Sequence, residues 1–329
     1  MKKDEITLIK YIRERFPLSE TIGVGIGDDA AVLKLKENTI LTTDLMIEDI
    51  HFDLSYTSFY HLGFKIVSVN VSDIYAMGGD FKGFLFSLGI PQTISDDEFS
   101  ELFDGIKDAL NYYDGFLIGG DLSRSQKIIL SGFAVGETEK PILRKGAQPG
   151  DFIFITSFLG LSSAGLNLLK NLSEDSKKII RSIRNFKKSP DKILNIEGVN
   201  EVLERHLMPV ARKPDKFKHL AKAMMDISDG LLIDLYRLCE ENNIGAEIYI
   251  EKIPIHPTLI SVANYLNTDI MRFILSGGED YELIIVSDKL EAQNFNLIPI
   301  GKITDQKGIY LIDPHKGKIP AKPEGWQHF

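Results

Sequence analysis

Six short acidic clusters recur along this chain, and each one combines carboxylates with Gly, Ser or Thr beside an apolar run. Carboxylates in such surroundings are unusual for a solvated surface, whereas their oxygens are the ligands that Mg²⁺ prefers, often as a bridge to phosphate. The pattern therefore predicts a site for divalent cations and indicates nucleotide chemistry. The clusters are residues 27–32, 42–45, 70–74, 119–121, 226–230 and 276–280.

The length and composition describe an ordinary soluble globular protein. A chain of 329 residues can bury a large core and favours about two domains. Its 43% hydrophobic and 26% charged residues are typical of such proteins. The 47 acidic residues outnumber the 38 basic ones, for a net charge of −9, which argues against general nucleic-acid binding. An acidic protein can still bind a polyanion when divalent metal ions supply positive charge.

A single cysteine and the absence of long apolar stretches indicate a cytoplasmic protein without a membrane partner. Cys239 alone cannot form an intrachain disulfide framework or a cysteine-based zinc site, and it suits a reducing compartment. No uninterrupted apolar stretch approaches the length of a bilayer span. Apolar residues at 6, 9, 12 and 16 recur at helical spacing, so we expect an amphipathic helix over residues 1–18 and not a signal peptide.

Helical and strand-like segments are mixed along the chain, which predicts an α/β or α+β fold. Turn-rich residues around Lys140-Pro141 and over 146–151 mark a domain boundary, so we expect domains over residues 1–140 and 141–329. The polar, basic stretch 171–205 is typical of an exposed helical excursion, with a binding patch as the alternative. The pattern predicts helices over residues 1–18, 61–77, 96–113 and 229–241, and strands over residues 30–35, 40–43, 84–90, 115–118, 128–135, 152–156, 246–250 and 282–286.

Several common nucleotide and metal motifs are excluded. Gly23-x-Gly25-x-Gly27 suggests a dinucleotide fingerprint, but that motif opens a helix, whereas here Asp28-Asp29 and a strand-like segment follow. The chain has no phosphate-binding P-loop, no protein-kinase catalytic loop and no histidine pair at metal-ligand spacing. Asp28-Asp29 therefore remains either a plain turn or part of a metal site.

Asp73 lies on the apolar stripe of the predicted helix over residues 61–77. It follows Val69 by four residues and precedes Met77 by four, so a core-facing position leaves its carboxylate in need of a partner. A buried ion pair and a metal site both satisfy that need.

The other clusters have a structural as well as a functional interpretation. Ser228 and Asp229 stand at a predicted helix start, where they could cap the helix or receive a phosphate. Residues 119–121 follow a predicted strand and could form a tight turn or let a ligand approach the backbone closely. Residues 276–281 precede a strand and carry the same ambiguity, and solvent exposure is the default for His51.

Taken in order, the clusters resemble the thiamine-monophosphate kinases, within the superfamily named after aminoimidazole ribonucleotide synthetase. The resemblance covers most of the chain and rests on the order Gly-Asp-Asp-Ala-Ala, Thr-Thr-Asp-x-x-x-Glu-x-x-His-Phe, Asn-x-Ser-Asp-x-x-Ala-Met-Gly, Gly-Gly-Asp, Asp-x-Ser-Asp-Gly and Ser-Gly-Gly-Glu-Asp-Tyr. It implies two domains: an N-terminal one of sheet and helices, whose sheets pair as a barrel in a homodimer, and a C-terminal α/β domain that completes the active site.

The same resemblance implies ATP and magnesium contacts for individual residues. Gly120, Asp121, Arg144 and Ser228 are expected to contact ATP, and Phe103 stands near the nucleotide where relatives can carry Tyr. The expected magnesium ligands are Asp28, Thr42, Thr43, Asp44, Asp73, Asp121, Asp226 and Asp229.

The implied reaction transfers a phosphoryl group from ATP to thiamine monophosphate and forms thiamine diphosphate. His51, Glu279 and Trp326 are expected to contact this substrate, since a cationic thiazolium is stabilised beside an aromatic ring and an acid. The acceptor is already an anionic phosphate, so no catalytic acid or base is expected. Several Mg²⁺ ions would bring two polyanions together for direct in-line transfer.

Two alternatives stay open. One is another ATP-using enzyme of the superfamily, such as a selenophosphate synthetase or a hydrogenase-maturation dehydratase. These usually carry a reactive cysteine near the N-terminus or at the C-terminus, whereas Cys239 lies on a predicted helix and the chain ends in Phe329. The other alternative is a non-catalytic Mg-nucleotide-binding protein, against which the set of carboxylates with Glu279 and Trp326 argues.

Overall fold

The computed structural model describes residues 11–12, 14–16, 22–24, 32–33, 35, 38–189 and 196–327. The chain divides into two compact units, which we describe separately. Unit 1 comprises Met1–Tyr75, Gly79–Pro141 and Glu174–Arg184, and unit 2 comprises Ala76–Gly78, Ile142–Ser173 and Asn185–Phe329. Both units mix helices with strands, so the predicted α/β class is confirmed.

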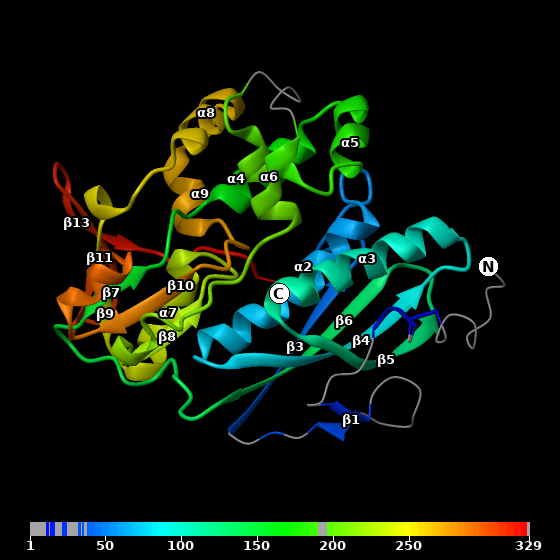
Figure 1. Cartoon of the computed structure of the whole chain (residues 1–329). Helices are drawn as coiled ribbons and strands as arrows, with labels where there is room; N and C mark the ends of the chain where they lie inside the picture. Colours follow the sequence, from blue (N-terminus) through cyan, green and yellow to red (C-terminus); the bar gives the residue numbers. More distant parts are fainter. Residues whose placement is uncertain are drawn as a thin grey trace. The chain divides into compact units, whose positions relative to one another are not determined.

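Unit 1 contains a four-stranded sheet with helices on one of its faces (Figure 1). The strand order is β3 (Asn38–Ile47), β6 (Ile129–Thr138), β4 (Asp80–Ile90) and β5 (Phe116–Arg124). Strands β3 and β4 pair with β6 antiparallel, whereas β4 and β5 are parallel and are joined through helix α3 (Asp96–Tyr113). A separate antiparallel pair is formed by β1 (Ile22–Val24) and β2 (Val32–Leu33).

Helices α2 (Phe59–Ala76) and α3 approach each other so closely that only glycine fits at their crossing. A Cβ atom at Gly63 would lie 2.0 Å from the carbonyl oxygen of Leu102, and one at Gly105 would lie 2.0 Å from that of Tyr60. The bounds of both helices agree with the predicted ranges 61–77 and 96–113 within two residues. This close contact fixes α2, the helix that carries Asp73, against α3.

The two faces of β3 differ in character because successive side chains of a strand point to opposite sides. Ile40 and Met46 are buried on the face that α2 and α3 cover, and Thr42 and Asp44 share that face. Leu41 and Leu45 lie on the opposite face and are 59% and 49% exposed. The described part of unit 1 therefore presents apolar side chains on the sheet face away from its helices.

The basic segment is only partly the exposed excursion that the sequence predicts. Helix α5 (Glu174–Arg181) and the residues after it, up to Arg184, belong to unit 1, although their neighbours in sequence belong to unit 2. Ile180 is fully buried and Ile183 is 8% exposed, so the apolar residues between the lysines anchor the segment. The prediction considered only the charge of this segment. A short amphipathic helix can be highly charged on one face and still bury apolar residues on the other.

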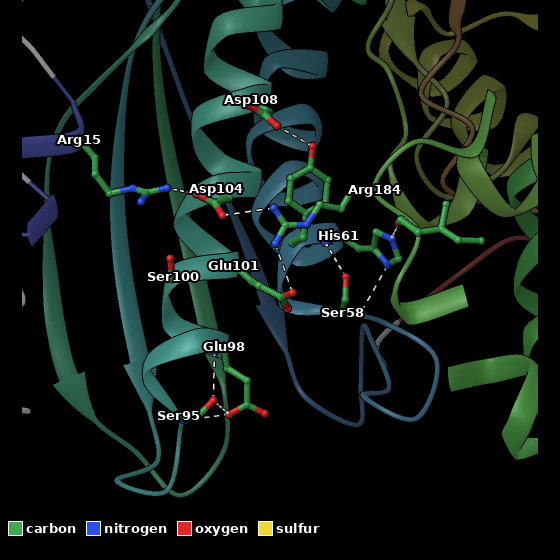
Figure 2. A network of polar contacts seen from close by, with 12 residues as sticks. Arg15, Ser58, His61, Ser95, Glu98, Ser100, Glu101, Asp104, Asp108 and Arg184 are labelled. Atoms are coloured by element: carbon green, nitrogen blue, oxygen red, sulfur yellow. Dashed lines mark hydrogen bonds and ion pairs between the residues drawn. The ribbon is translucent and has the colours of Figure 1, made fainter. Parts of the chain in front are cut away.

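Polar contacts hold this segment to α2 and α3 (Figure 2). His61 Nε2 lies 2.6 Å from the carbonyl oxygen of Ile183, and Nδ1 accepts a hydrogen bond from the Ser58 amide at 3.3 Å. Burial lowers the pKa of His61 to about 4, so the neutral ring donates from Nε2 at neutral pH. Arg184 contacts Glu101 and Asp104 at 3.3 Å each and stacks over the Tyr60 ring.

Unit 2 is built on a seven-stranded sheet in which neighbours are antiparallel except for β9 and β12. Helices α4 (Leu161–Lys170), α6 (Val199–Leu207) and α8 (Pro257–Leu266) pack against one another (Figure 1). The remaining helices are α7 (Leu231–Asn242) and α9 (Ile270–Ser276), with 3₁₀ turns at Phe186–Lys188, Lys218–Leu220, Ile250–Lys252 and Leu290–Phe295. The strand order is β13 (Gly317–Ala321), β12 (Gly308–Asp313), β9 (Gly245–Tyr249), β11 (Ile298–Thr304), β7 (Phe152–Ile155), β10 (Leu283–Ser287) and β8 (Ala223–Asp226). Among the described residues, no helix is both long enough and apolar enough to cross a membrane.

Candidate functional site

Three oxygen-bearing side chains from two of the acidic clusters lie in one part of unit 1. Thr42 on β3 donates its hydroxyl to Asp73 Oδ2 on α2 at 2.5 Å. Asp44 lies on the same face of β3, and its amide donates to the side chain of Asn70 on α2. The fold thus brings residues 42–44 beside residues 70–73, and the oxygen-only donor set suits a hard cation such as Mg²⁺.

Asn70 fastens these two clusters together, and sequence reasoning assigned it no role. Its side chain is fully buried; Oδ1 accepts from the Asp44 amide at 3.1 Å, and Nδ2 donates to the Ile66 carbonyl at 2.8 Å. A Cβ atom at residue 132 would lie 2.3 Å from Nδ2, so Gly132 makes room for this amide. A signal did exist, since a polar residue inside a predicted apolar helix needs a partner.

Thr43 and Asp121 are not brought to this group within the described part of unit 1. Thr43 lies on the opposite face of β3 and donates its hydroxyl to the Gly132 carbonyl at 2.7 Å. Asp121 is exposed on β5, which β6 and β4 separate from β3, a gap of about 14 Å at three inter-strand spacings. The resemblance implies that both residues are magnesium ligands, whereas within unit 1 their side chains lie apart from those of Thr42, Asp44 and Asp73.

Residues 119–121 do not follow a strand, as the sequence predicts, but lie inside β5. The predicted strand ended at residue 118 because glycines are depleted in strands. Here glycine is required, since a Cβ atom at Gly120 would lie 2.0 Å from the Phe86 carbonyl oxygen on β4. The tight turn considered for this cluster is therefore wrong.

His51, Phe103 and Asp28 complete the predicted residues of unit 1. His51 is half-buried after β3, and its Nδ1 accepts from the Ile47 amide at 3.0 Å, so simple solvent exposure is wrong. Phe103 is 1% exposed, with its ring centroid 4.9 Å from that of Phe99, and this core position offers no surface to a nucleotide. Asp28 lies outside the described residues.

In unit 2 the fold joins three separate predicted segments through backbone hydrogen bonds. The Glu279 amide donates to the Ser228 carbonyl at 2.7 Å, and the Tyr281 amide donates to the Ile227 carbonyl at 2.9 Å. The Trp326 amide donates to the Asp229 carbonyl at 3.0 Å, and the Trp326 side chain is 51% exposed. The loop 227–230, the loop 277–282 and Trp326 therefore form one cluster.

Asp234 caps the start of α7, a role for which Ser228 was one candidate in the sequence. The helix begins after Gly230, and Asp234 Oδ2 accepts from the amides of Ser228, Asp229 and Gly230 at 3.0–3.1 Å. Burial raises the pKa of Asp234 to about 6. Arg237 Nη1 contacts both Asp229 Oδ2 at 2.5 Å and Asp234 Oδ1 at 2.8 Å. The capping hypothesis for Ser228 is wrong, because a carboxylate one turn into the helix takes these amides.

Asp226 directly precedes the loop of this cluster, whereas Arg144 contacts the last residue of α7, at the far end of the helix from Gly230. Asp226 ends the buried strand β8, opposite Leu283, and is 4% exposed. Arg144 is exposed before β7, and its carbonyl accepts from Asn242 at 2.7 Å. Within the described ranges, no group of three or more His, Cys, Asp or Glu side chains is placed to hold a metal ion. The side chains that could still contribute oxygen ligands to a hard cation such as Mg²⁺ are those of Thr42, Asp44 and Asp73 in unit 1 and of Asp226 and Asp229 in unit 2.

Two family models match this architecture in order. Residues 27–138 match the AIR synthase related protein, N-terminal domain, and residues 148–314 match the corresponding C-terminal domain. The fold and the oxygen-rich clusters therefore define a protein of the AIR synthase related class.

Relatives place the chain more narrowly within that class. It is 35% identical to a thiamine-monophosphate kinase of Aquifex aeolicus, with 92% of each chain covered, and 30% identical to that of Bacillus subtilis, with 99% of each covered. The solved structure of AaThiL complexed with AMPPCP and TMP superposes with a TM-score of 0.75 at 34% identity, covering 98% of this chain and 96% of that one. The chain belongs to the thiamine-monophosphate kinase family.

Proposed function

We propose that this protein phosphorylates thiamine monophosphate with ATP and releases thiamine diphosphate and ADP. The observation that carries the proposal is the contact of loop 227–230, loop 277–282 and Trp326 in unit 2, where carboxylates adjoin an exposed aromatic ring. Full-length similarity to kinases that use this acceptor supports it, as does the related structure complexed with AMPPCP and TMP.

The chain's own residues supply binding and orientation for this transfer. Thr42, Asp44 and Asp73 in unit 1, and Asp226 and Asp229 in unit 2, are the residues that would hold Mg²⁺. Several such ions, when bound, neutralise the phosphates and stabilise the transferring group. We propose that Asp121 and Asp28 also bind Mg²⁺. We leave out the side chain of Thr43, because it lies on the opposite face of β3 and donates to the Gly132 carbonyl.

The phosphate-facing and substrate-facing contacts come from different side chains. We propose that Gly120 and Asp121 border ATP and that Arg144 and Ser228 bind its phosphates, and we leave Phe103 out because it is buried in the core. Glu279 and the half-exposed Trp326 would bind the cationic thiazolium, and His51 would contact thiamine phosphate. The acceptor phosphate is already a nucleophilic anion, so the transfer is direct and forms no phosphoenzyme.

An ADP-release assay with a panel of phosphate acceptors tests the proposed function. With Mg·ATP, thiamine monophosphate is expected to support steady turnover, while free thiamine, which lacks the acceptor phosphate, should give none. Turnover with a different acceptor of the panel would point to another ATP-using enzyme of the superfamily. ATP binding without turnover on any acceptor would favour a non-catalytic Mg-nucleotide-binding protein.

We propose that two copies pair through the sheets of unit 1, as cytoplasmic homodimers. Leu41 and Leu45 are exposed on the sheet face away from α2 and α3, and a second copy would remove them from water. Asp121 lies on the edge strand β5, away from Asp44 on β3. In a dimer, we propose that Asp121 joins the metal-binding residues of the second copy. Sedimentation at micromolar concentration should return twice the 37.0 kDa chain mass. A monomeric mass would rule the pairing out.

A further inference from the structure

The loop 277–282 carries three acidic side chains and has an unusual backbone conformation at two of its residues. Glu279 and Tyr281 adopt left-handed conformations, with φ of 63° and 50°, which non-glycine residues rarely occupy. Such a conformation persists only where the surroundings hold it in place. Each of the three acids, Glu279, Asp280 and Glu282, is held by a different group of unit 2.

Glu282 is the anchor of the loop. Its carboxylate is fully buried and accepts hydrogen bonds from Arg205 at 2.8 Å, from Thr156 at 2.6 Å and from Arg212. Arg212 binds both carboxylate oxygens, with Nε at 2.7 Å and Nη2 at 2.6 Å. The paired, charge-assisted geometry fixes one end of the loop to α6 and to the segment after it.

Asp280 fixes the middle of the loop to the start of α4. Its carboxylate accepts from the Gly160 amide at 2.6 Å and from the Ser162 amide at 3.3 Å. Burial raises the pKa of Asp280 to about 7. The side chains of Asp280 and Glu282 are both buried. Glu279, whose backbone is left-handed, has a side chain that is 29% exposed.

Glu279 meets a buried histidine that is adjacent in sequence to Arg205. His206 Nδ1 lies 3.1 Å from Glu279 Oε2 and 3.2 Å from Ser162 Oγ. His206 is 4% exposed, whereas the Glu279 side chain is 29% exposed, so the histidine contacts the carboxylate from its protein side. With Glu279 ionised, a hydrogen bond at this distance requires the proton on Nδ1.

We propose that His206 is a positioning residue that holds the Glu279 carboxylate for the cationic ring of the substrate. The inference rests on the proposed function and names a residue outside the ligand sets given above. The histidine contacts the carboxylate from its buried side through one ring nitrogen, which orients Glu279 while 29% of that side chain stays exposed to a ligand. Helix α6 thus fixes the loop at Glu282 through Arg205 and aims Glu279 through the next residue.

The experiment compares two substitutions of His206 in the full chain. His206→Leu removes the Nδ1 donor and keeps an apolar body of similar size, and His206→Asn keeps a donor near the Nδ1 position. Calorimetry with thiamine monophosphate should show the dissociation constant rise about tenfold in His206→Leu, the effect of one lost hydrogen bond to a charged group. His206→Asn should bind within about threefold of wild type, and the affinity for AMPPCP should stay unchanged in both.

A matched control and a double-mutant cycle separate positioning from general destabilisation. His256 also contacts a glutamate, Glu201, at 3.3 Å in unit 2, and His256→Leu should leave the binding of thiamine monophosphate unchanged. In a Glu279→Gln background, His206→Leu should add little, since it acts through the same carboxylate. Additive losses, or an equal loss of AMPPCP affinity, would overturn the inference. Absence of thiamine monophosphate binding by the wild type would overturn it together with the proposed function, whereas normal binding by both wild type and His206→Leu would overturn the positioning role alone.

Discussion

Asp73→Asn should lower kcat/KM by about 10²–10³-fold, the loss typical when one preorganised electrostatic group is removed from an active site. The carboxylate accepts the Thr42 hydroxyl and belongs to the oxygen-only set of unit 1. Asparagine keeps the shape but lowers the charge that a divalent cation needs. The Mg²⁺ concentration for half-maximal rate should rise as well, and a steady-state titration of Mg²⁺ measures both quantities.

Two further variants make that result specific. Asp44→Asn should show a loss of similar size, because Asp44 shares the helix-covered face of β3 with Thr42. Asp97→Asn alters an exposed carboxylate in the first turn of α3 and should retain the wild-type rate. If Asp44→Asn and Asp73→Asn both kept normal turnover, the metal-site assignment would be wrong.

Glu282→Gln should reduce the free energy of unfolding of unit 2 by about 3–5 kcal/mol, the usual cost of removing one partner from a buried ion pair. The carboxylate has no exposed surface and contacts both Arg205 and Arg212, so the variant would remove the negative charge that both guanidinium groups share. Urea unfolding followed by the fluorescence of Trp326 reports on this unit, because the chain has one tryptophan.

Glu247→Gln is the matched control for that measurement. Glu247 contacts Lys318 at 2.9 Å in the same unit, but both side chains are partly exposed. Solvent screening limits such a pair to about 1 kcal/mol or less. Equal losses in the two variants would show that burial of Glu282 adds nothing to stability.

Local periodicity predicts the framework of this protein well. The helix over residues 96–113 agrees residue for residue with α3, and the stripe that carries Asp73 does lie on α2. The strand prediction over 40–43 stopped short of β3, which continues to Ile47. Had the full strand been predicted, the alternation of faces would have separated Thr43 from Thr42 and Asp44.

The partners of the site residues depend on tertiary packing and could not be derived from spacing. Asn70 accepts the amide of Asp44, which lies 26 positions away in the sequence, because folding brings α2 beside β3. His206 contacts Glu279 across 73 positions of sequence, a pairing that no local pattern encodes. A polar residue within an apolar pattern indicates that a hydrogen-bond partner is needed, but the pattern does not identify the partner.

The segment 174–184 also bears on how this architecture can be divided. A cut after Pro141, where the turn-rich stretch begins, would not release a complete first module, since the residues that cover His61 and meet Glu101 would stay with the other fragment. The chain leaves unit 2 at Ser173 and returns at Asn185. Gene fusions, exchanges of halves between relatives and truncations must therefore carry this eleven-residue excursion along with the N-terminal portion, or supply a substitute for it.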